Sequence, residues 1–371
     1  ERVAHELAMV WGGAVWSLDA QGRSLSEQDA IPASYPRRRL PRTPPMGRLV
    51  LPVPSAQLWS LLRSDQPLHG HLPSIGGLLV LLFAALVRPR RRVTAHWHFF
   101  FEPASGWSGR FFSVYQWLAL RVVSRLSGGI TTSPLLKDEL VRCGCRPERV
   151  AVLPCCLSQE QETGALMTSR SSSETQANPV MRVLFIGRLG SYKRLDWLLL
   201  SLARVESAWS LDVVGDGPRR AEFEALSDEL MTSRRGGVVR FHGRLSEAEK
   251  LSQLRAADLL VLPSESSNEA FGIVQLEAMA AGLPALAFQR RRSGMGWVCQ
   301  LADLDWSQTP EDLALVLQKL AGNPALRRHL GVQARRRYEQ LFSRSIWLDQ
   351  LNHWSNPLNS SQTPVGFRVR G

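Results

Sequence analysis

Residues 258–288, DLLVLPSESSNEAFGIVQLEAMAAGLPALAF, decide the fold that this sequence predicts. The apolar run Leu259–Pro263 is short enough for a strand that is buried on both faces. We expect a helix over Ile273–Ala281, because Gly282 and a proline two residues later are typical of a helix end. Pro284–Phe288 has the composition of the next parallel strand. The stretch therefore predicts one strand–helix–strand unit of a parallel α/β sheet.

The loop of this unit carries the chemistry. It reaches the expected helix through Phe271 and Gly272, and a glycine there lets a ligand approach the backbone closely. The N–H groups of the first helical turn, up to Ile273, favour an anionic oxygen. Glu269 and Glu277 add carboxylates, which disfavour a bare phosphate but accept hydrogen bonds from neutral sugar hydroxyls. The mixture favours a nucleotide sugar over a bare nucleotide.

Glu269-x7-Glu277, within EAFGIVQLEAMAAGLP, resembles the donor-site signature of retaining GT-B glycosyltransferases of family 4. The simpler alternative is an ordinary strand–helix–strand unit with two solvated glutamates. The resemblance implies an α/β fold of two Rossmann-like, doubly wound parallel-sheet domains that face a cleft. It also implies hexose transfer from a nucleotide diphosphate sugar to a hydroxyl of a glycan or lipid-linked acceptor, with retention of anomeric configuration.

The length and composition fit two globular domains. The chain has 371 residues, of which 44% are hydrophobic and 21% are charged. The longest apolar run, Leu78–Val87, is too short to span a bilayer. We interpret the five cysteines as reduced thiols of a cytoplasmic protein, with a zinc site as the alternative. They are Cys143, Cys145, Cys155, Cys156 and Cys299.

The net charge of +12 is concentrated in the first part of the chain. Residues 1–158 carry 19 Lys and Arg against 10 Asp and Glu, whereas the remainder carries 26 against 23. A basic half can face an anionic membrane, a phosphorylated acceptor or nucleic acid. A nucleic-acid-binding protein is therefore one alternative, although no recognised binding motif supports it. A GT-B scaffold that binds nucleotide sugar without catalysis is another.

The pattern of elements divides the chain into two Rossmann-like domains, and the resemblance implies that the first lies on the acceptor side and the second binds the nucleotide sugar. We expect the first domain over 1–158, a linker over 159–179, the second domain over 180–343, a helix over 344–356 that crosses back, and a tail over 357–371. The chain begins at Glu1 with a helical pattern over Glu1–Ala8. The resemblance implies a strand and a Gly-Gly loop before such a helix, so we expect an N-terminal truncation.

Strands and helices are expected to alternate in both domains. In the first, the expected strands are Ala14–Leu18, Arg48–Val53, Gln66–Gly70, Arg92–Trp97, Gly129–Thr132 and Val150–Leu153, and the expected helices Ala56–Arg63, Ile75–Val87, Arg110–Leu126 and Pro134–Cys143. In the second, further strands are expected over Met181–Ile186, Ser210–Val214, Val238–Phe241 and Trp297–Ala302, and helices over Leu195–Val205, Arg219–Leu230, Ser246–Ala256, Glu311–Ala321, Pro324–Leu330 and Gln333–Trp354.

Two cations follow the first strand of the second domain. Arg188 and Lys193 stand where a strand-to-helix loop can neutralise a diphosphate leaving group, although a solvated basic loop is the simpler alternative. The resemblance implies that both hold the donor pyrophosphate, that Glu269 holds the sugar hydroxyls and that Glu277 holds the ribose. It places the backbone of Phe271, Gly272 and Ile273 at the phosphate or sugar, and that of Gly243, Arg244 and Leu245 at the base. The family usually has glycine after the lysine, whereas this chain has Arg194.

Four histidines stand near the carboxyl ends of two expected strands, where ligands of open α/β sheets bind. They are His69, His71, His96 and His98. The resemblance assigns catalysis to His96 and Glu269, with His98 as the second choice for the histidine that faces the sugar. Metal binding by the four histidines is the alternative; no acidic residue accompanies them and the family dispenses with metal, so we expect neither metal nor cofactor. Asp303-Leu304-Asp305 lies outside the expected donor site.

The expected helix over Arg110–Leu126 is rich in aromatic and basic residues, and Arg88–Arg92 adds a basic cluster. Two interpretations remain open. The helix contacts an anionic membrane at the inner face, or its apolar residues Phe112, Tyr115 and Leu118, which follow helical spacing, pack in the core.

Overall fold

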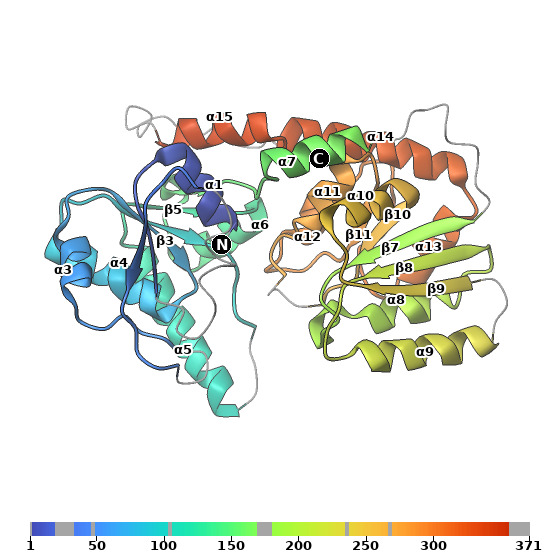
Figure 1. The fold of residues 1–371 in the computed structure, drawn as a ribbon, viewed down its shortest axis with the longest axis horizontal. Coiled ribbons are helices and arrows are strands. Elements are labelled where there is room, and N and C mark those ends of the chain that lie inside the picture. Colours follow the sequence, from blue (N-terminus) through green and yellow to red (C-terminus); the bar gives the residue numbers. More distant parts are fainter. Residues whose placement is uncertain are drawn as a thin grey trace. The chain divides into compact units, whose positions relative to one another are not determined.

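The computed structural model describes residues 2–18, 33–45, 49–102, 106–168, 180–233, 237–265 and 269–355. The chain divides into two compact units, the first up to Leu153 and the second from Pro154 onward. Each unit is built on a parallel sheet flanked by helices (Figure 1). Within the described ranges, no helix combines the length and the apolar character that crossing a membrane requires.

The first unit contains a four-stranded parallel sheet in the order β3-β4-β5-β6 and a separate parallel pair, β1-β2. The strands are β1 (Val15–Leu18), β2 (Arg37–Leu40), β3 (Leu68–Leu72), β4 (Val93–Trp97), β5 (Gly128–Thr131) and β6 (Val150–Val152). The helices are α1 (Arg2–Trp11), α3 (Ala56–Arg63), α4 (Ile75–Val87), α5 (Gly106–Val123) and α6 (Pro134–Arg142). The expected alternation of strand and helix is confirmed for β3 to β6.

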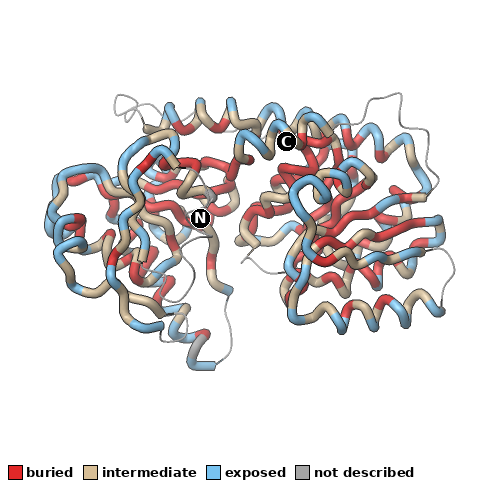
Figure 2. The backbone as a smooth tube through the Cα atoms, viewed as in Figure 1, coloured by how far each residue is buried: buried red, intermediate tan, exposed pale blue. Residues whose placement is uncertain are grey.

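Serine side chains begin three of these helices. Ser55, Ser74 and Ser133 each accept a hydrogen bond from the N–H three residues further on, at 3.2–3.3 Å. The apolar faces of α4, α5 and α6 share one buried core with β4, and buried backbone is red in Figure 2. Trp97 and Phe100 are the largest fully buried side chains of this core. The burial fixes which face of each strand points toward the helices.

The prediction was wrong before β3. The described part of Arg48–Val53 is not a strand: it pairs through isolated bridges, one of them antiparallel between Arg42 and Pro52, and proline has no N–H to donate to a ladder. Arg37–Leu40, which is not among the expected strands, forms strand β2. Its arginines conceal the strand pattern, and one of them lies over an aromatic ring: the Arg38 guanidinium is 5.2 Å from the ring centre of Trp16 on β1.

The second unit contains a five-stranded parallel sheet in the order β11-β10-β7-β8-β9. Its strands are β7 (Met181–Ile186), β8 (Trp209–Val214), β9 (Gly237–Gly243), β10 (Leu259–Leu262) and β11 (Ala285–Ala287). Its helices are α7 (Gln159–Met167), α8 (Leu195–Leu202), α9 (Arg220–Ser233), α10 (Glu247–Ala256), α11 (Val274–Ala280), α12 (Met295–Val298), α13 (Leu313–Ala321), α14 (Pro324–Leu341) and α15 (Arg344–Ser355). The strand–helix–strand unit predicted from residues 258–288 is confirmed as β10, α11 and β11.

Two predictions for this unit were wrong. Part of the expected linker is helix α7, which a capping box between Ser158 and Gln161 begins. The expected strand Trp297–Ala302 is not formed, and helix α12 ends at Val298. The guanidinium of Arg337 on α14 donates to the carbonyls of Trp297 and Val298 at 2.6 and 2.9 Å, so these carbonyls have side-chain partners instead of a neighbouring strand.

The C-terminal helices also differ from the prediction, because α14 continues through Gly331 and ends at Leu341. Gly331 lies against the backbone of the turn after α11. A Cβ added to it would lie 2.4 Å from the carbonyl oxygen of Gly282. The glycine therefore marks a close approach between α14 and this turn and not a break in the helix.

We expect Gly331→Ala to lower the free energy of unfolding by roughly 1–3 kcal/mol, because the clash outweighs the better helix propensity of alanine. Urea unfolding measures the effect. Gly322→Ala is the matched control, since the atom nearest to its added Cβ is 3.7 Å away. Equal stability of the two variants would contradict the close approach.

Candidate functional site

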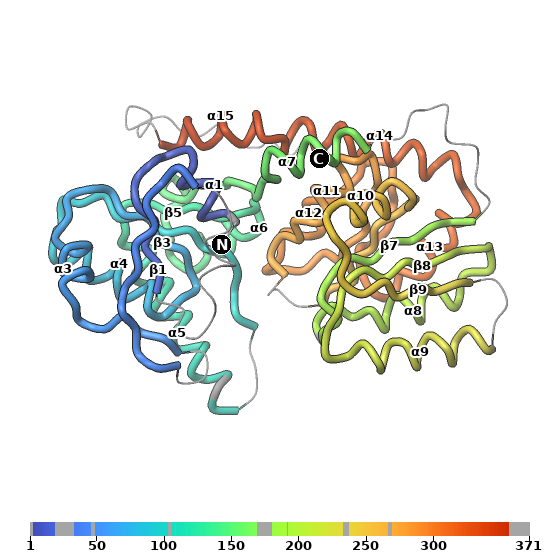
Figure 3. Tube along the Cα trace, in the orientation of Figure 1, coloured from blue at the N-terminus to red at the C-terminus, as the bar shows by residue number. Residues whose placement is uncertain are grey.

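The order of strands in the second sheet creates a switch point. The chain runs from β7 to β8 and β9 on one side and then returns to β10 and β11 on the other (Figure 3). The neighbouring strands β7 and β10 therefore send their loops to opposite sides, and ligands of open α/β sheets bind in the crevice between such loops. The two loops are joined by a hydrogen bond from the N–H of Glu265 to the carbonyl of Tyr192, at 3.1 Å.

Two predicted site residues meet at this switch point. The ammonium of Lys193, on the loop after β7, forms an ion pair and hydrogen bond with the carboxylate of Glu269, on the loop after β10. Only 10% of the Lys193 side chain and 19% of the Glu269 side chain are exposed. The backbone around Glu269 is held as well, because Ser293 donates its hydroxyl to the Glu269 carbonyl at 2.6 Å. The site thus combines a cation and a carboxylate in fixed positions, shielded from water.

The sequence analysis missed the role of Arg194. Its φ of 47° lies in the left-handed region that favours glycine, which is the residue that the family usually has here. The arginine is held by the carboxylates of Asp196 and Glu265, each at 2.7 Å, and its guanidinium lies 3.8 Å from the ring centre of Trp197. These contacts offset the backbone strain and tie the β7 loop to the β10 loop a second time. Arg188, in contrast, is exposed.

Backbone hydrogen bonds connect the residues at the carboxyl ends of β7, β8 and β9. Gly187 donates to the carbonyl of Val214 at 2.9 Å, and Gly215 donates to that of Gly243 at 2.7 Å. A Cβ on Gly215 would lie 2.0 Å from the Gly187 carbonyl oxygen. The predicted base-side segment therefore begins in this backbone network at Gly243, with Arg244 exposed beside it.

The other predicted donor residues lie at the start of α11. Phe271 is buried, Gly272 has a φ of 68°, and Ile273 begins the helix without a side-chain cap. The positive φ explains the glycine in the Phe-Gly step. The helix that follows has seven residues, fewer than the sequence predicts.

Glu277 is buried on α11, and its carboxylate already has partners. Lys250 of α10 approaches it to 2.8 Å, and Gln161 of α7 donates to it at 3.3 Å. Burial by itself would lower the pKa of Lys250, but Glu277 and Glu247 together outweigh it, so this pKa is raised. Lys250 and Gln161 were not predicted, because contacts between distant segments leave no local pattern in the sequence.

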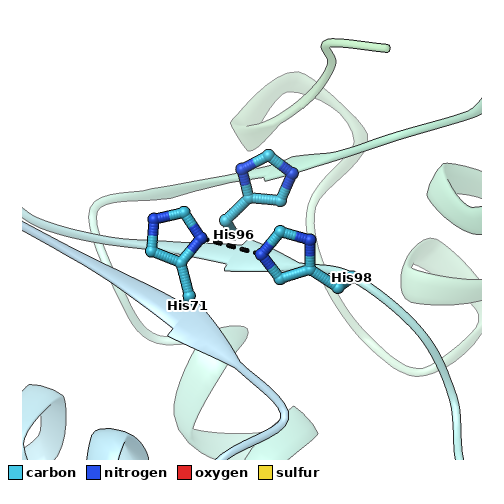
Figure 4. Close-up of side chains that lie close together, drawn as sticks. All are labelled: His71, His96 and His98. Atoms are coloured by element: carbon cyan, nitrogen blue, oxygen red, sulfur yellow. Dashed lines mark hydrogen bonds between the residues drawn. The ribbon is translucent and has the colours of Figure 1, made fainter. Parts of the chain in front are cut away.

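The four predicted histidines come together, but only His71, His96 and His98 lie at the carboxyl ends of β3 and β4, because β3 begins at Leu68 and His69 is its second residue. His71 pairs with His96 in the ladder, and His98 continues the chain from β4. The rings of His96 and His98 are stacked 4.2 Å apart, and Nδ1 of His71 hydrogen-bonds Nε2 of His98 at 2.7 Å (Figure 4). His69 lies beside them and bonds Thr94 at 2.9 Å.

Burial keeps these imidazoles neutral. It lowers the pKa of His71 to about 4, and burial together with the charge of His71 lowers the pKa of His98 to about 3. The pKa values of His69 and His96 are lowered in the same direction, first by burial and then by their histidine neighbours. His96 is fully buried, and neither ring nitrogen has a hydrogen-bond partner among the described residues.

The segment Asp303-Leu304-Asp305 takes no part in either cluster of site residues. Asp303 interacts with His329 and Gln333 of α14, and Asp305 is exposed. In the described ranges, the cysteines form no cluster with metal-binding geometry, whereas His71, His96 and His98 do. Their ligand nitrogens all lie within 4.8 Å of one another.

Two family models match the sequence. Glycosyltransferase Family 4 matches residues 1–161, and Glycosyl transferases group 1 matches residues 171–337. The lipopolysaccharide core biosynthesis glycosyltransferase LpsD of Rhizobium meliloti is 34% identical over 165 residues, which cover 44% of this chain and 45% of LpsD. A D-inositol 3-phosphate glycosyltransferase of Streptomyces bingchenggensis is 31% identical over 211 residues, which cover 52% of this chain and 45% of that enzyme. The matches thus span about half the length of these curated relatives.

Solved structures share the fold. HepE of Anabaena in complex with UDP is similar with a TM-score of 0.68 and 18% identity, covering 96% of this chain and 95% of HepE. Sucrose-phosphate synthase from Thermosynechococcus elongatus is similar with a TM-score of 0.67 and 21% identity, covering 95% and 91% of the two chains. At these identities the likeness shows the architecture.

We expect the free energy of unfolding to fall as the pH decreases below about 6.5, because the buried histidines stay neutral in the folded state but bind protons in the unfolded state. Each contribution is complete above pH 6.5 and is lost progressively toward about pH 4 for His71 and about pH 3 for His98. The slope is about 1.4 kcal/mol per pH unit for each histidine.

Urea unfolding at several pH values, in buffer that contains EDTA, measures this slope. His71→Gln should make the slope shallower by the contribution of one histidine, about 1.4 kcal/mol per pH unit. His353→Gln, at an exposed position, is the control. The same slope in both variants would show that His71 is not held neutral by burial.

Proposed function

The chain belongs to the family 4 glycosyltransferases and has their GT-B fold, and we propose that it transfers a hexose from a nucleotide diphosphate sugar to a hydroxyl group. The acceptor in this proposal is a growing glycan or a lipid-linked glycan, and the anomeric configuration is retained. The observation that carries the proposal is the shielded contact of Lys193 with Glu269 at the switch point. It supplies one group for each half of the donor.

Lys193 suits the diphosphate. Its ammonium is compact, and its surroundings are largely closed to water, where a cation stabilises the negative charge that develops on a leaving group more strongly than in bulk solvent. Without donor, the Glu269 carboxylate balances this buried charge. When the donor binds, its diphosphate takes over part of that balance, and the carboxylate becomes available to the sugar hydroxyls.

The remaining donor contacts follow from the same edge of the sheet. In this proposal Glu277 accepts hydrogen bonds from the ribose hydroxyls, while Lys250 holds its carboxylate in place. The backbone at Gly243 lies at the end of β9, where it can form hydrogen bonds with the base of the nucleotide. HepE, which shares the fold, was crystallised with UDP and with UDP-glucose, so UDP-sugars are the first donors to test.

Lys193→Ala should weaken donor binding and lower kcat/KM by about 100-fold, because the cation acts on the ground state and on the leaving group together. Transfer and donor binding are measured with the donor that the chain accepts. The control is Lys319→Ala, which removes an exposed lysine from α13. Unchanged kinetics and unchanged nucleotide affinity in Lys193→Ala would remove this residue from the site.

Glu269→Gln separates the two halves of the donor. It keeps the shape of the side chain and removes the charge, so transfer should fall while the affinity for the free nucleoside diphosphate changes little. An equal loss of diphosphate binding would assign Glu269 a structural role instead.

The acceptor side of the proposal includes a peripheral contact with an anionic membrane through helix α5. Its Trp107, Phe111, Val114 and Leu118 follow helical spacing and are 87, 50, 57 and 48% exposed. The opposite face, which includes Tyr115, packs in the core. The core-packing interpretation is confirmed for Tyr115 and is wrong for Leu118, and the membrane contact is proposed for the exposed face alone.

The composition of the exposed face favours a lipid surface. Arg110 is exposed on it, and Arg121 lies 4.2 Å from the ring centre of Trp117, while α5 has no acidic residue. Aromatic side chains with arginines beside them suit the boundary between headgroups and acyl chains of anionic lipids. In the described part of the chain, every Trp and Phe side chain that is largely exposed belongs to the first unit and lies on α3, α4 or α5.

Replacing Trp107 and Phe111 by alanine together should weaken binding to vesicles that contain phosphatidylglycerol by at least about tenfold, because each ring loses its buried area. Co-sedimentation measures the binding. Leu315→Ala with Val332→Ala is the matched control, since these side chains are 70 and 64% exposed in the second unit. Equal binding of the two double variants, or equal binding to neutral phosphatidylcholine vesicles, would contradict the contact.

A further inference from the structure

The histidine cluster of the first unit offers a set of metal ligands, one of which, His96, is also the residue that the resemblance assigns to catalysis. His71, His96 and His98 come from one strand end and its neighbour, and their ligand nitrogens lie within 4.8 Å of one another (Figure 4). We propose that these three residues bind a single divalent transition-metal ion of the zinc class. The proposal departs from the expectation that the chain needs no metal.

His96 gives the first argument. Its side chain is fully buried, and both ring nitrogens lack a partner among the described residues. An unpaired polar group away from water is costly, so such a group indicates a missing ligand. Figure 4 shows the His96 ring beside the hydrogen-bonded pair of His71 and His98, with which it shares the cluster.

The donor set gives the second argument. Neutral imidazole is the preferred ligand of zinc and of its neighbours in the first transition row, and three histidines with one open position form a recurring zinc site. The metal-ligand cluster found in the described residues contains no carboxylate or thiolate, which disfavours magnesium and calcium. Zn²⁺, Co²⁺ and Ni²⁺ are therefore the ions that fit this chemistry.

The distances require only a local adjustment. A four-coordinate ion at about 2.0–2.1 Å from each nitrogen holds two nitrogens roughly 3.4 Å apart. The distance between Nδ1 of His71 and Nε2 of His98, now 2.7 Å, would increase, and the longer nitrogen–nitrogen distances in the cluster would decrease. The His96 and His98 rings, now nearly parallel at 4°, would turn about their Cβ–Cγ bonds, for which histidine has a broad torsional minimum.

His69 provides a matched comparison within the same cluster. It lies next to the three residues, but its Nδ1 bonds Thr94, and it is not part of the group whose nitrogens converge. Removing it changes the packing around the site without removing a ligand. His329 provides the comparison at the surface, where it lies 2.5 Å from Asp303 and could bind zinc weakly on its own.

The test is titration of the untagged, EDTA-stripped chain with Zn²⁺ by calorimetry. We expect one ion per chain, and His71→Ala, His96→Ala and His98→Ala should each weaken binding by about 100-fold or more. His69→Ala and His329→Ala should keep wild-type affinity within a few-fold. Absence of stoichiometric binding, retention of affinity in the three ligand variants, or loss of binding in His329→Ala would overturn the proposal.

A second measurement uses the wild-type chain alone, so it does not depend on whether a variant folds. X-ray absorption of the zinc complex should show three imidazole ligands at about 2.0 Å. Sulfur ligands would overturn the proposal in favour of the cysteines. Because metal binding is read directly, the outcome is independent of whether the chain transfers sugar.

Discussion

The contact between the Lys193 ammonium and the Glu269 carboxylate is the interaction on which the second unit's site depends. It joins the loops after β7 and β10, which the strand order sends to opposite sides. A buried charge is tolerated when a partner balances it, and removing one partner of a buried pair leaves the other uncompensated. The pair therefore both holds the two loops together and keeps a cation and an anion ready at the place where a charged ligand enters.

Other groups at this edge serve the same end. Arg194 accepts a left-handed backbone conformation because Asp196 and Glu265 hold its guanidinium. Gly215 leaves no room for a side chain between the β7 and β8 loops. Backbone hydrogen bonds between the loops make the edge rigid, and a rigid site loses little freedom when a ligand binds. In the first unit, the ends of β3 and β4 gather polar rings in a comparable position on a smaller sheet.

The sequence predicted the sheets and most of their helices, because buried parallel strands are apolar runs and the helices between them have recognisable caps. It failed where a partner from a distant segment decides the local structure. Arg37–Leu40 is a strand because it pairs with β1. Trp297–Ala302 is not a strand, and Arg337 donates hydrogen bonds to its first two carbonyls. The capping box at Ser158 was a local signal for α7 that the polar composition of the segment concealed.

The site was predictable in its residue types more than in its contacts. Lys193 and Glu269 were both predicted, but their pairing follows from the strand order, which a local pattern does not contain. Glu277 has two partners, Lys250 and Gln161, which lie 27 and 116 residues earlier in the chain on other helices. The four histidines were expected at neighbouring strand ends, yet the hydrogen bond of His71 with His98 depends on the register of β3 with β4.

Thermal unfolding of the intact chain with a panel of nucleotide diphosphate sugars tests the central claim most directly, namely that the switch point of the second unit binds such a donor. A ligand that binds only the folded state at about 100 times its Kd stabilises it by about 2.7 kcal/mol. The account predicts a rise in Tm with at least one UDP-sugar and a smaller rise with UDP alone. A folded chain whose Tm does not change with any nucleotide sugar or nucleoside diphosphate would contradict it.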